Sequence, residues 1–234
     1  MSEAPGAFAA TLAPVHRAGW PFVAGALLVG VAAGFLWAPL FWLGAAAATG
    51  CAYFFRDPAR VTPIAPEIVV SPADGRIQRV GPRLPPAELG LGDRPLPCVS
   101  VFLSVLDVHV NRTPVAGRVV TKIYRPGLFL NAALDKASTD NERQGWVIEA
   151  EGGASIGLVQ IAGLVARRIV TFVEAGALLP PGERVGLIRF GSRCDVYLPD
   201  GTTPLVIEGQ RAIGGETVLA RLGVPAEAPH GRRS

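Results

Sequence analysis

One glycine–serine pair lies between two apolar runs whose alternation is typical of β-strands: residues 187–190 precede it and residues 194–198 follow it. Because glycine has no Cβ, Gly191 can adopt backbone angles closed to other residues and leave its own carbonyl carbon open to attack. The hydroxyl of Ser192 can turn back onto that carbonyl, and it becomes an effective nucleophile when a base removes its proton. The pair is therefore a candidate site for a reaction of the chain with itself. The ordinary alternative is a turn that contains glycine and serine.

A base for such a reaction is sought first among the histidines, which are His16, His109 and His230. The first and last are near the chain ends, so imidazole chemistry in the body of the protein depends on His109. Imidazole titrates near neutral pH and can both accept and donate protons. The alternative is a structural histidine bonded to a backbone carbonyl. Asp74, in the turn 72–75, equally has an ordinary alternative role, because aspartate side chains stabilise turns.

Composition argues against several other kinds of site. Cys51, Cys98 and Cys194 are odd in number and widely spaced. Neither a zinc site nor a disulfide framework is predicted, and a reducing compartment is indicated. The two lysines, Lys122 and Lys136, leave few candidates for a Schiff-base lysine. The net charge of +3 comes without a basic cluster interleaved with aromatic residues, so no nucleic acid is expected. A slight positive balance suits a protein that lies against anionic lipid.

The N-terminal part of the chain is too apolar for an ordinary soluble domain. Half of the residues are hydrophobic, the mean hydropathy is +0.36, and residues 18–55 contain no charge. We predict a flexible segment at 1–18 and a membrane anchor at 19–55, built as a helical hairpin that turns near Pro39. One long tilted span is the main alternative. Arginines flank the interval on both sides, which favours both termini on the cytoplasmic side of the cell (inner) membrane.

Residues 56–224 have the pattern of a mainly β domain, followed by a disordered tail at 225–234. Short apolar runs alternate with proline, glycine and aspartate, which predicts antiparallel strands in a sandwich or barrel-like fold. Residues 83–97 are predicted to form a surface loop, and 131–143 is the one moderately helical stretch. The predicted strands are 68–70, 75–80, 99–105, 117–123, 146–150, 156–161, 168–173 and 185–190.

Several motifs, in the same order along the chain, resemble those of the short-type phosphatidylserine decarboxylase proenzymes. Each motif is weak alone, and the ordered set from about residue 54 to about residue 220 is highly specific. They are Phe54-Phe55-Arg56-Asp57-Pro58, Ser71-Pro72-Ala73-Asp74-Gly75, Asp107-Val108-His109-Val110-Asn111-Arg112, Asn141-Glu142-Arg143, Gln160-Ile161-Ala162-Gly163 with Ala166-Arg167-Arg168-Ile169, and Phe190-Gly191-Ser192-Arg193 with Asp195-Val196-Tyr197-Leu198-Pro199.

The resemblance implies self-cleavage between Gly191 and Ser192. The Ser192 hydroxyl converts the peptide bond to an ester, and loss of the Ser192 Cα proton expels that ester to leave dehydroalanine. Rearrangement and hydrolysis then give a pyruvoyl group. The implied products are a β chain, residues 1–191, and an α chain, residues 192–234, that begins with the pyruvoyl group. No external cofactor and no metal is expected.

The same resemblance implies the reaction and its residues. The pyruvoyl ketone forms a Schiff base with the amino group of phosphatidylserine and accepts the electrons released with CO2, so that phosphatidylethanolamine is the product. His109 is implied as the base and proton donor, and Asp74 as the group that orients it, in an Asp-His-Ser arrangement. Membrane lipid is the expected partner, and association with a second copy of the chain stays open.

The sequence departs from part of this family at one position. Longer-type members have two histidines three residues apart; the first corresponds to His109, and Arg112 takes the place of the second. His109 therefore serves both steps, or another group assists self-cleavage. Candidates for binding the substrate phosphate or carboxylate are four arginines, because guanidinium makes paired hydrogen bonds to either group; each has a surface ion pair as its alternative. They are Arg112, Arg167, Arg168 and Arg193.

Two other classes of function compete with this interpretation. A membrane-anchored serine hydrolase could use Asp74, His109 and Ser192, although the serine is not in a G-x-S-x-G motif. A carrier domain of the biotinyl type needs a lysine between methionines, and the one methionine is Met1. A hydrolase keeps its chain intact, whereas self-processing splits every molecule.

Overall fold

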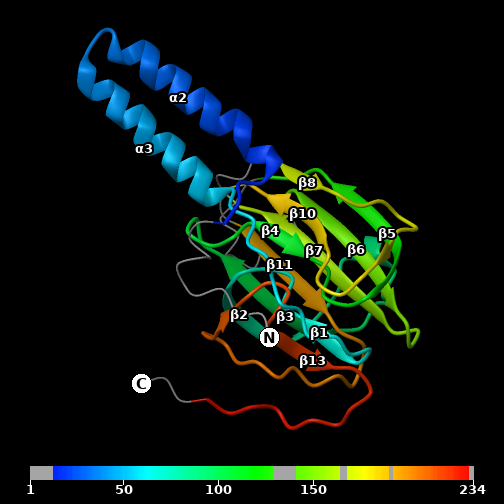
Figure 1. Ribbon diagram of the computed structural model, residues 1–234. Coiled ribbons are helices and arrows are strands. Elements are labelled where there is room, and N and C mark those ends of the chain that lie inside the picture. Colours follow the sequence, from blue (N-terminus) through cyan, green and yellow to red (C-terminus); the bar gives the residue numbers. More distant parts are fainter. Residues whose placement is uncertain (1–12, 129–140, 164–167, 190–191, 232–234) are drawn as a thin grey trace. The chain divides into compact units, whose positions relative to one another are not determined.

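A computed structural model describes residues 13–128, 141–163, 168–189 and 192–231 (Figure 1). The chain divides into two compact units, Met1–Ala59 and Arg60–Ser234. The first unit is helical and the second is mainly β. Gly191, Arg167 and the predicted helical residues 131–140 lie outside the described residues.

The first unit contains two apolar helices, α2 (Trp20–Gly34) and α3 (Ala38–Phe54), after the short η1 (Arg17–Gly19). The chain reverses at residues 35–37, as a hairpin requires, while Pro39 lies in the first turn of α3. Proline is tolerated there because its missing N–H would have no helical partner. The helices approach closely at Gly30 and Gly44: a Cβ on Gly30 would lie 2.7 Å from the Gly44 Cα atom.

Among the helices that the structure describes, one, Arg17–Gly34, is long and apolar enough to cross a membrane; Ala38–Phe54 is apolar but shorter. Large apolar side chains are exposed on both helices: Leu28 of α2 and Trp42 of α3 are each 71% exposed. Exposed apolar side chains are costly in water, so α2 is a candidate membrane anchor.

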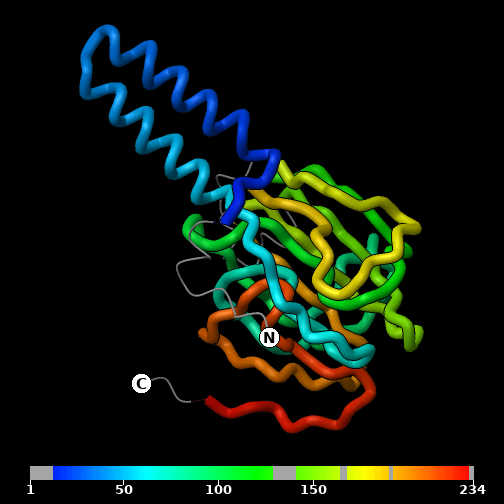
Figure 2. The backbone as a smooth tube through the Cα atoms, viewed as in Figure 1, coloured from blue at the N-terminus to red at the C-terminus, as the bar shows by residue number. Residues whose placement is uncertain are grey.

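The second unit is built from antiparallel sheets, the largest of which has eight strands and curls into a half-barrel (Figures 1 and 2). A three-stranded sheet, in the order β4-β10-β8, and a two-stranded sheet, β1-β13, complete it. The mainly β prediction is therefore confirmed. The strands are β1 (Ile68–Val70), β2 (Gly75–Arg83), β3 (Leu96–Leu103), β4 (Val110–Arg112), β5 (Gly117–Arg125), β6 (Arg143–Ala150), β7 (Ser155–Ala162), β8 (Ile169–Thr171), β9 (Leu178–Leu179), β10 (Arg184–Ile188), β11 (Ser192–Tyr197), β12 (Arg211–Ala212) and β13 (Val218–Arg221).

The strand order of the large sheet, β12-β2-β3-β11-β7-β6-β5-β9, consists of two matching sets that meet between β11 and β7. The small sheets match as well, because β1 pairs with β13 as β4 pairs with β10. Even the irregularities correspond. The register of β2 against β3 shifts between Ile77 and Arg79, and that of β5 against β6 shifts between Val119 and Thr121. The second unit therefore consists of two copies of one structural repeat.

Loop hydrogen bonds occur in the same matched pairs. The backbone N–H of Ser71 donates to the Thr217 carbonyl at 2.8 Å, and in the second repeat the N–H of Thr113 donates to the Glu183 carbonyl at 2.7 Å. The sequence carries the signal too: residues 71–76 read S-P-A-D-G-R, and residues 113–118 read T-P-V-A-G-R. This similarity was missed in the sequence analysis, although it marks the start of each repeat.

The second repeat is inserted into the first. Residues 110–188 form one repeat, while residues 68–103 and 192–221 together form the other. The chain therefore passes between repeats twice, between β3 and β4 and between β10 and β11. His109 ends the first junction and Ser192 directly follows the second, so the insertion places the two candidate residues at the same boundary.

The glycines that follow the two equivalent turns lie against a neighbouring backbone. A Cβ on Gly75 would collide with the Phe102 carbonyl oxygen, and one on Gly117 with the Glu149 carbonyl oxygen. We expect Gly75→Ala and Gly117→Ala each to cost about 1–3 kcal/mol, lowering the thermal unfolding midpoint by about 2–12 °C. Gly152→Ala is the control, because a Cβ there meets no atom within 4 Å. Equal midpoints for all three variants would contradict the close approach.

The main core lies on one face of the large sheet, between it and the small sheets. Side chains from both repeats contribute, including the fully buried Trp146, Leu158 and Val196. A second cluster on the opposite face is covered by the short η2 (Ala87–Leu89), whose Leu89 is buried. Along β11 the side chains alternate, so Cys194 belongs to the main core and Tyr197 to the second cluster. This alternation decides where Ser192 and Arg193 point.

Candidate active site

Ser192 is the first residue of β11, a central strand of the large sheet. It pairs with Leu103 of β3 on one side and with Ala162 of β7 on the other. The residue is fully buried, and its hydroxyl oxygen has no hydrogen-bond partner within the part of the chain that the structure describes. A buried hydroxyl without a partner is costly, which marks Ser192 as a residue kept for a reason other than stability.

His109 lies at the other junction, directly before β4, and is fully buried. Its backbone carbonyl accepts a hydrogen bond from the N–H of Ile188, at 3.3 Å, at the end of β10. Its ring Nδ1 lies 2.9 Å from the Asp107 carbonyl oxygen. Because a carbonyl only accepts, Nδ1 carries the proton in the neutral ring, and Nε2 is then the basic nitrogen. His109 is thus prepared to act as a base through Nε2.

Asp107 holds the turn that precedes His109, a role that the sequence did not reveal. One carboxylate oxygen accepts hydrogen bonds from the Ser104 N–H at 2.8 Å and from its hydroxyl at 2.7 Å. The other oxygen pairs with Arg211 at 2.6 Å. These bonds fix the turn whose backbone carbonyl orients the His109 ring. The same turn presents Val105 and Leu106 to solvent, 55% and 65% exposed.

Asp74 lies in the turn before β2, whose counterpart in the second repeat is the turn at 113–117, and it has two partners of its own. Its carboxylate pairs with Arg60 at 2.7 Å and accepts the Gly214 N–H at 2.8 Å. Burial raises the pKa of the Asp74 carboxyl, while Arg60 and the Gly214 N–H oppose that rise. Asp74 therefore stabilises its own turn. Orientation of His109 by Asp74 stays a prediction, since the hydrogen bond that the structure gives for Nδ1 is to the Asp107 carbonyl, which accepts it.

The predicted anion-binding arginines occupy different environments. Arg112 is buried and donates to the Gly182 carbonyl at 2.9 Å. Arg168 is exposed at the start of β8. Partial burial, with Arg168 nearby, lowers the pKa of the Arg189 guanidinium. The backbone N–H of Arg189 lies 3.4 Å from the Arg168 carbonyl oxygen. Two neighbouring cations favour an anion between them, and Arg189 is three residues before Ser192, so Arg189 joins Arg168 as a candidate.

Arg193 has a different environment from the one that phosphate binding requires. It is 1% exposed, and its guanidinium forms two contacts with the Asp195 carboxylate, at 2.9 and 3.1 Å. Arg83 of β2 also pairs with Asp195, at 3.3 Å. Since strand side chains alternate, Arg193 points to the face opposite that of Ser192. This buried cluster ties the start of β11 to β2, and it positions the strand rather than a ligand.

In the described parts of the chain, neither the buried cysteines nor a group of metal ligands forms a second candidate site. Burial raises the pKa values of the Cys98 and Cys194 thiols far above their usual range, which keeps both protonated and unreactive. Among the residues that the structure describes, no group of three or more His, Cys, Asp or Glu side chains is arranged to hold a metal ion.

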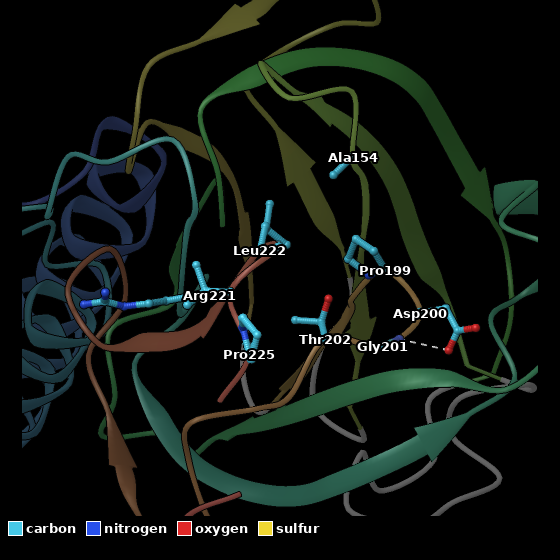
Figure 3. Close-up of a pocket in the computed structure, with 10 residues that line it drawn as sticks. Ala154, Pro199, Asp200, Gly201, Thr202, Arg221, Leu222 and Pro225 are labelled. Atoms are coloured by element: carbon cyan, nitrogen blue, oxygen red, sulfur yellow. Dashed lines mark hydrogen bonds between the residues drawn. The ribbon is translucent and has the colours of Figure 1, made fainter. Parts of the chain in front are cut away.

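The repeat supplies a natural comparison for this site. In the second repeat the counterpart of Ser192 is Ala154, at the turn before β7. The Ala154 carbonyl accepts the Ala150 N–H at 2.9 Å, so Ala154 lies opposite Ala150 at the end of β6, as Ser192 lies opposite Leu103 at the end of β3. Ala116 likewise has the place of Asp74. A pocket of about 390 Å³ lies at this position, and Ala154 is one of its lining residues (Figure 3). The other lining residues are Pro199, Asp200, Gly201, Thr202, Arg221, Leu222, Gly223, Val224 and Pro225.

The counterpart of His109 is not a histidine either. The Leu222 N–H donates to the Glu67 carbonyl at 2.7 Å, as the Ile188 N–H donates to that of His109. Serine, histidine and aspartate thus occur together in only one of the two equivalent positions. The fold itself requires none of them, since the other repeat forms without them.

Comparisons with known proteins agree with the motifs. Residues 48–220 match the sequence profile of the family described as phosphatidylserine decarboxylase. The chain is 60% identical over 207 residues to a phosphatidylserine decarboxylase proenzyme of Beijerinckia indica subsp. indica, covering 88% of this chain and 89% of that protein. It is 56% identical over 211 residues to a proenzyme of the same name from Nitrobacter winogradskyi, covering 90% and 85%.

Proposed function

Because this chain belongs to the phosphatidylserine decarboxylase family and is a carboxy-lyase, we propose that it first splits itself between Gly191 and Ser192. Ser192 then becomes a pyruvoyl group, and the processed enzyme converts phosphatidylserine to phosphatidylethanolamine and CO2. The observation that carries the proposal is the buried Ser192 hydroxyl, which has no hydrogen-bond partner in the described structure and lies at a junction between repeats.

Self-cleavage starts with transfer of the Ser192 hydroxyl proton to a base, for which His109 Nε2 is the candidate. The oxygen then attacks the Gly191 carbonyl carbon, the C–N bond breaks, and an ester forms as the amine takes up a proton. Removal of the Ser192 Cα proton expels the residue 191 carboxylate and leaves dehydroalanine, which tautomerises and takes up water to lose ammonia. Burial of Ser192 supports this order of events, because bulk water is kept from the ester.

The pyruvoyl group, once formed, supplies an electron-withdrawing ketone that accepts the electron pair left when CO2 departs. The protein residues then have three tasks. Arg168 and Arg189 attract the negatively charged headgroup through its phosphate. The buried site leaves the carboxylate weakly solvated, so interactions strengthen where charge develops during reaction. His109 returns a proton to the carbon that has lost CO2.

The substrate is delivered from the membrane. The turn that Asp107 holds exposes Val105 and Leu106, which precede His109 by four and three residues. An ordered turn with two apolar side chains at its tip suits contact with acyl chains beside the buried site. The apolar α2 supports anchoring to the cell membrane, and the arginines on both sides of the apolar interval support a cytoplasmic catalytic unit.

We expect the double variant Val105→Ser/Leu106→Ser to decarboxylate phosphatidylserine in vesicles about tenfold more slowly, because two apolar contacts with lipid are lost. Its rate on a short-chain phosphatidylserine dissolved as monomers changes little. Leu178→Ser is the control, since Leu178 is 72% exposed on the edge strand β9. Equal losses on both substrates would assign the turn to the catalytic machinery rather than to lipid contact.

The proposal is tested by intact-mass analysis of the purified full chain. We expect two chains whose masses correspond to residues 1–191 and 192–234, the smaller carrying a ketone in place of its N-terminal amine. Phosphatidylserine with borohydride then adds mass to the small chain and stops turnover. A single unmodified chain that is active on an ester substrate would instead favour the serine hydrolase that uses Asp74, His109 and Ser192.

A further inference from the structure

Three buried side chains form a hydrogen-bonded chain inside the β unit. The Trp146 indole Nε1–H donates to Gln160 Oε1 at 2.9 Å, and Gln160 Nε2 donates to Asn111 Oδ1 at 2.8 Å. Indole nitrogen can only donate, so Trp146 fixes which end of the Gln160 amide accepts and which end donates. Gln160 in turn fixes the Asn111 amide, whose Nδ2 group is left as the donor at the end of the chain.

That terminal donor has nothing to bind in the described structure. Asn111 is fully buried, and its Nδ2 atom has no hydrogen-bond partner among the described residues. A buried donor without a partner lowers the stability of the fold. The preceding chain of two bonds keeps this donor pointing one way, so it is held in place at a cost in stability.

The position of the donor connects it to His109 and Ser192. Asn111 is two residues after His109, in β4, and pairs with Gly186 of β10. Gln160 pairs with Cys194 of β11, two residues after Ser192. Both Gln160 and Ser192 belong to the strand faces that carry the main core. The donor therefore lies in the layer of side chains that contains the candidate base and nucleophile.

The other repeat shows that the fold does not need these polar groups. At the positions equivalent to Asn111, Trp146 and Gln160, the first repeat has three fully buried apolar residues. A polar chain present in one repeat and absent from its structural counterpart indicates a role beyond the stability of the fold. The apolar counterparts are Val69, Val99 and Leu198.

We propose that Asn111 Nδ2 donates a hydrogen bond to the Gly191 carbonyl oxygen as that oxygen becomes negatively charged under attack by Ser192. The inference rests on the proposed self-cleavage and adds a residue to it. A donor that lacks a partner before reaction and gains one in the transition state accelerates the step by the full value of the new bond. Arg112, which takes the place of the second histidine of longer-type members, donates through its guanidinium to the Gly182 carbonyl.

The test is the rate at which freshly purified or freshly refolded full-length Asn111→Asp splits into two chains. This substitution keeps an oxygen for Gln160 and replaces the donor by an acceptor. We expect splitting to slow by about 10²–10³-fold, the loss typical of one oxyanion donor. Gln144→Glu is the matched control, because Gln144 is a buried amide in the same sheet that donates to the Gly145 carbonyl at 3.0 Å.

Hydroxylamine, which cleaves esters, identifies the step. If the donor assists ester formation, no ester accumulates in Asn111→Asp, and hydroxylamine does not speed its splitting. Rapid splitting by hydroxylamine, an unchanged rate in Asn111→Asp, or equal slowing in Gln144→Glu would each overturn the inference while leaving the proposed function intact. A parent chain that never splits would overturn both.

Discussion

Ser192→Ala is expected to remain one chain of 234 residues and to have no decarboxylase activity. Alanine has no oxygen to attack the Gly191 carbonyl, so neither the ester nor the ketone derived from it can form. Because the ketone is the electron acceptor of the reaction, activity falls to background rather than by a factor. The measurement is intact mass together with release of labelled CO2 from carboxyl-labelled phosphatidylserine.

Loss of structure does not explain the expected result. Ser192 is buried within β11 and its hydroxyl makes no hydrogen bond in the described structure, so its removal leaves no donor or acceptor unsatisfied. We expect an unfolding midpoint equal to or above that of an unsplit parent. Decarboxylation by an unsplit, folded Ser192→Ala protein would refute the pyruvoyl mechanism.

The repeat provides a second control for this prediction. Ala154→Ser creates a glycine–serine bond, Gly153–Ser, at the position equivalent to the candidate cleavage site. Its surroundings lack the chemistry, because Glu67 replaces the histidine and Ala116 the aspartate. We expect no splitting at this bond. Splitting there would show that the strand geometry alone drives the reaction and that His109 and Asp74 are dispensable.

Local sequence patterns predicted where many of the strands lie. Alternating apolar residues identified strands such as β5 and β7, because burial of one sheet face repeats every second residue. The turn between the two helices was expected near Pro39, and in the structure the chain turns slightly earlier, at residues 35–37. Proline stops a helix on its C-terminal side but is well suited to the first turn of the next one.

Long-range partners are what the sequence patterns lacked. Asp107 was quoted only as part of a motif, whereas its bonds to Ser104 and Arg211 build the turn that holds His109. Arg193 was expected to bind substrate, yet its environment is set by Asp195 two residues along the same strand. Asn111 and Gln160 were not singled out, because amides acquire a direction only from neighbours that are distant in sequence. Only the duplicated S/T-P-x-x-G-R segment could have revealed the repeat in advance.

His109→Gln is expected to reduce both steps, and to slow decarboxylation by about 10²–10⁴-fold, the usual contribution of a positioned acid–base group. Glutamine retains a donor for the Asp107 carbonyl, which now binds Nδ1 at 2.9 Å, but it cannot accept and return a proton near neutral pH. The loss therefore reports proton transfer rather than a missing structural bond.

The two steps are separated by counting ketones. Protein that has split after long incubation is titrated for its pyruvoyl content by reductive trapping, and CO2 release is expressed per ketone. Asp107→Asn is the matched control, because it weakens the turn through Ser104 and Arg211 but leaves the backbone carbonyl that holds the His109 ring. We expect it to lose much less turnover per ketone than His109→Gln. Equal turnover per ketone in His109→Gln and the parent would remove His109 from decarboxylation and restrict it to self-cleavage.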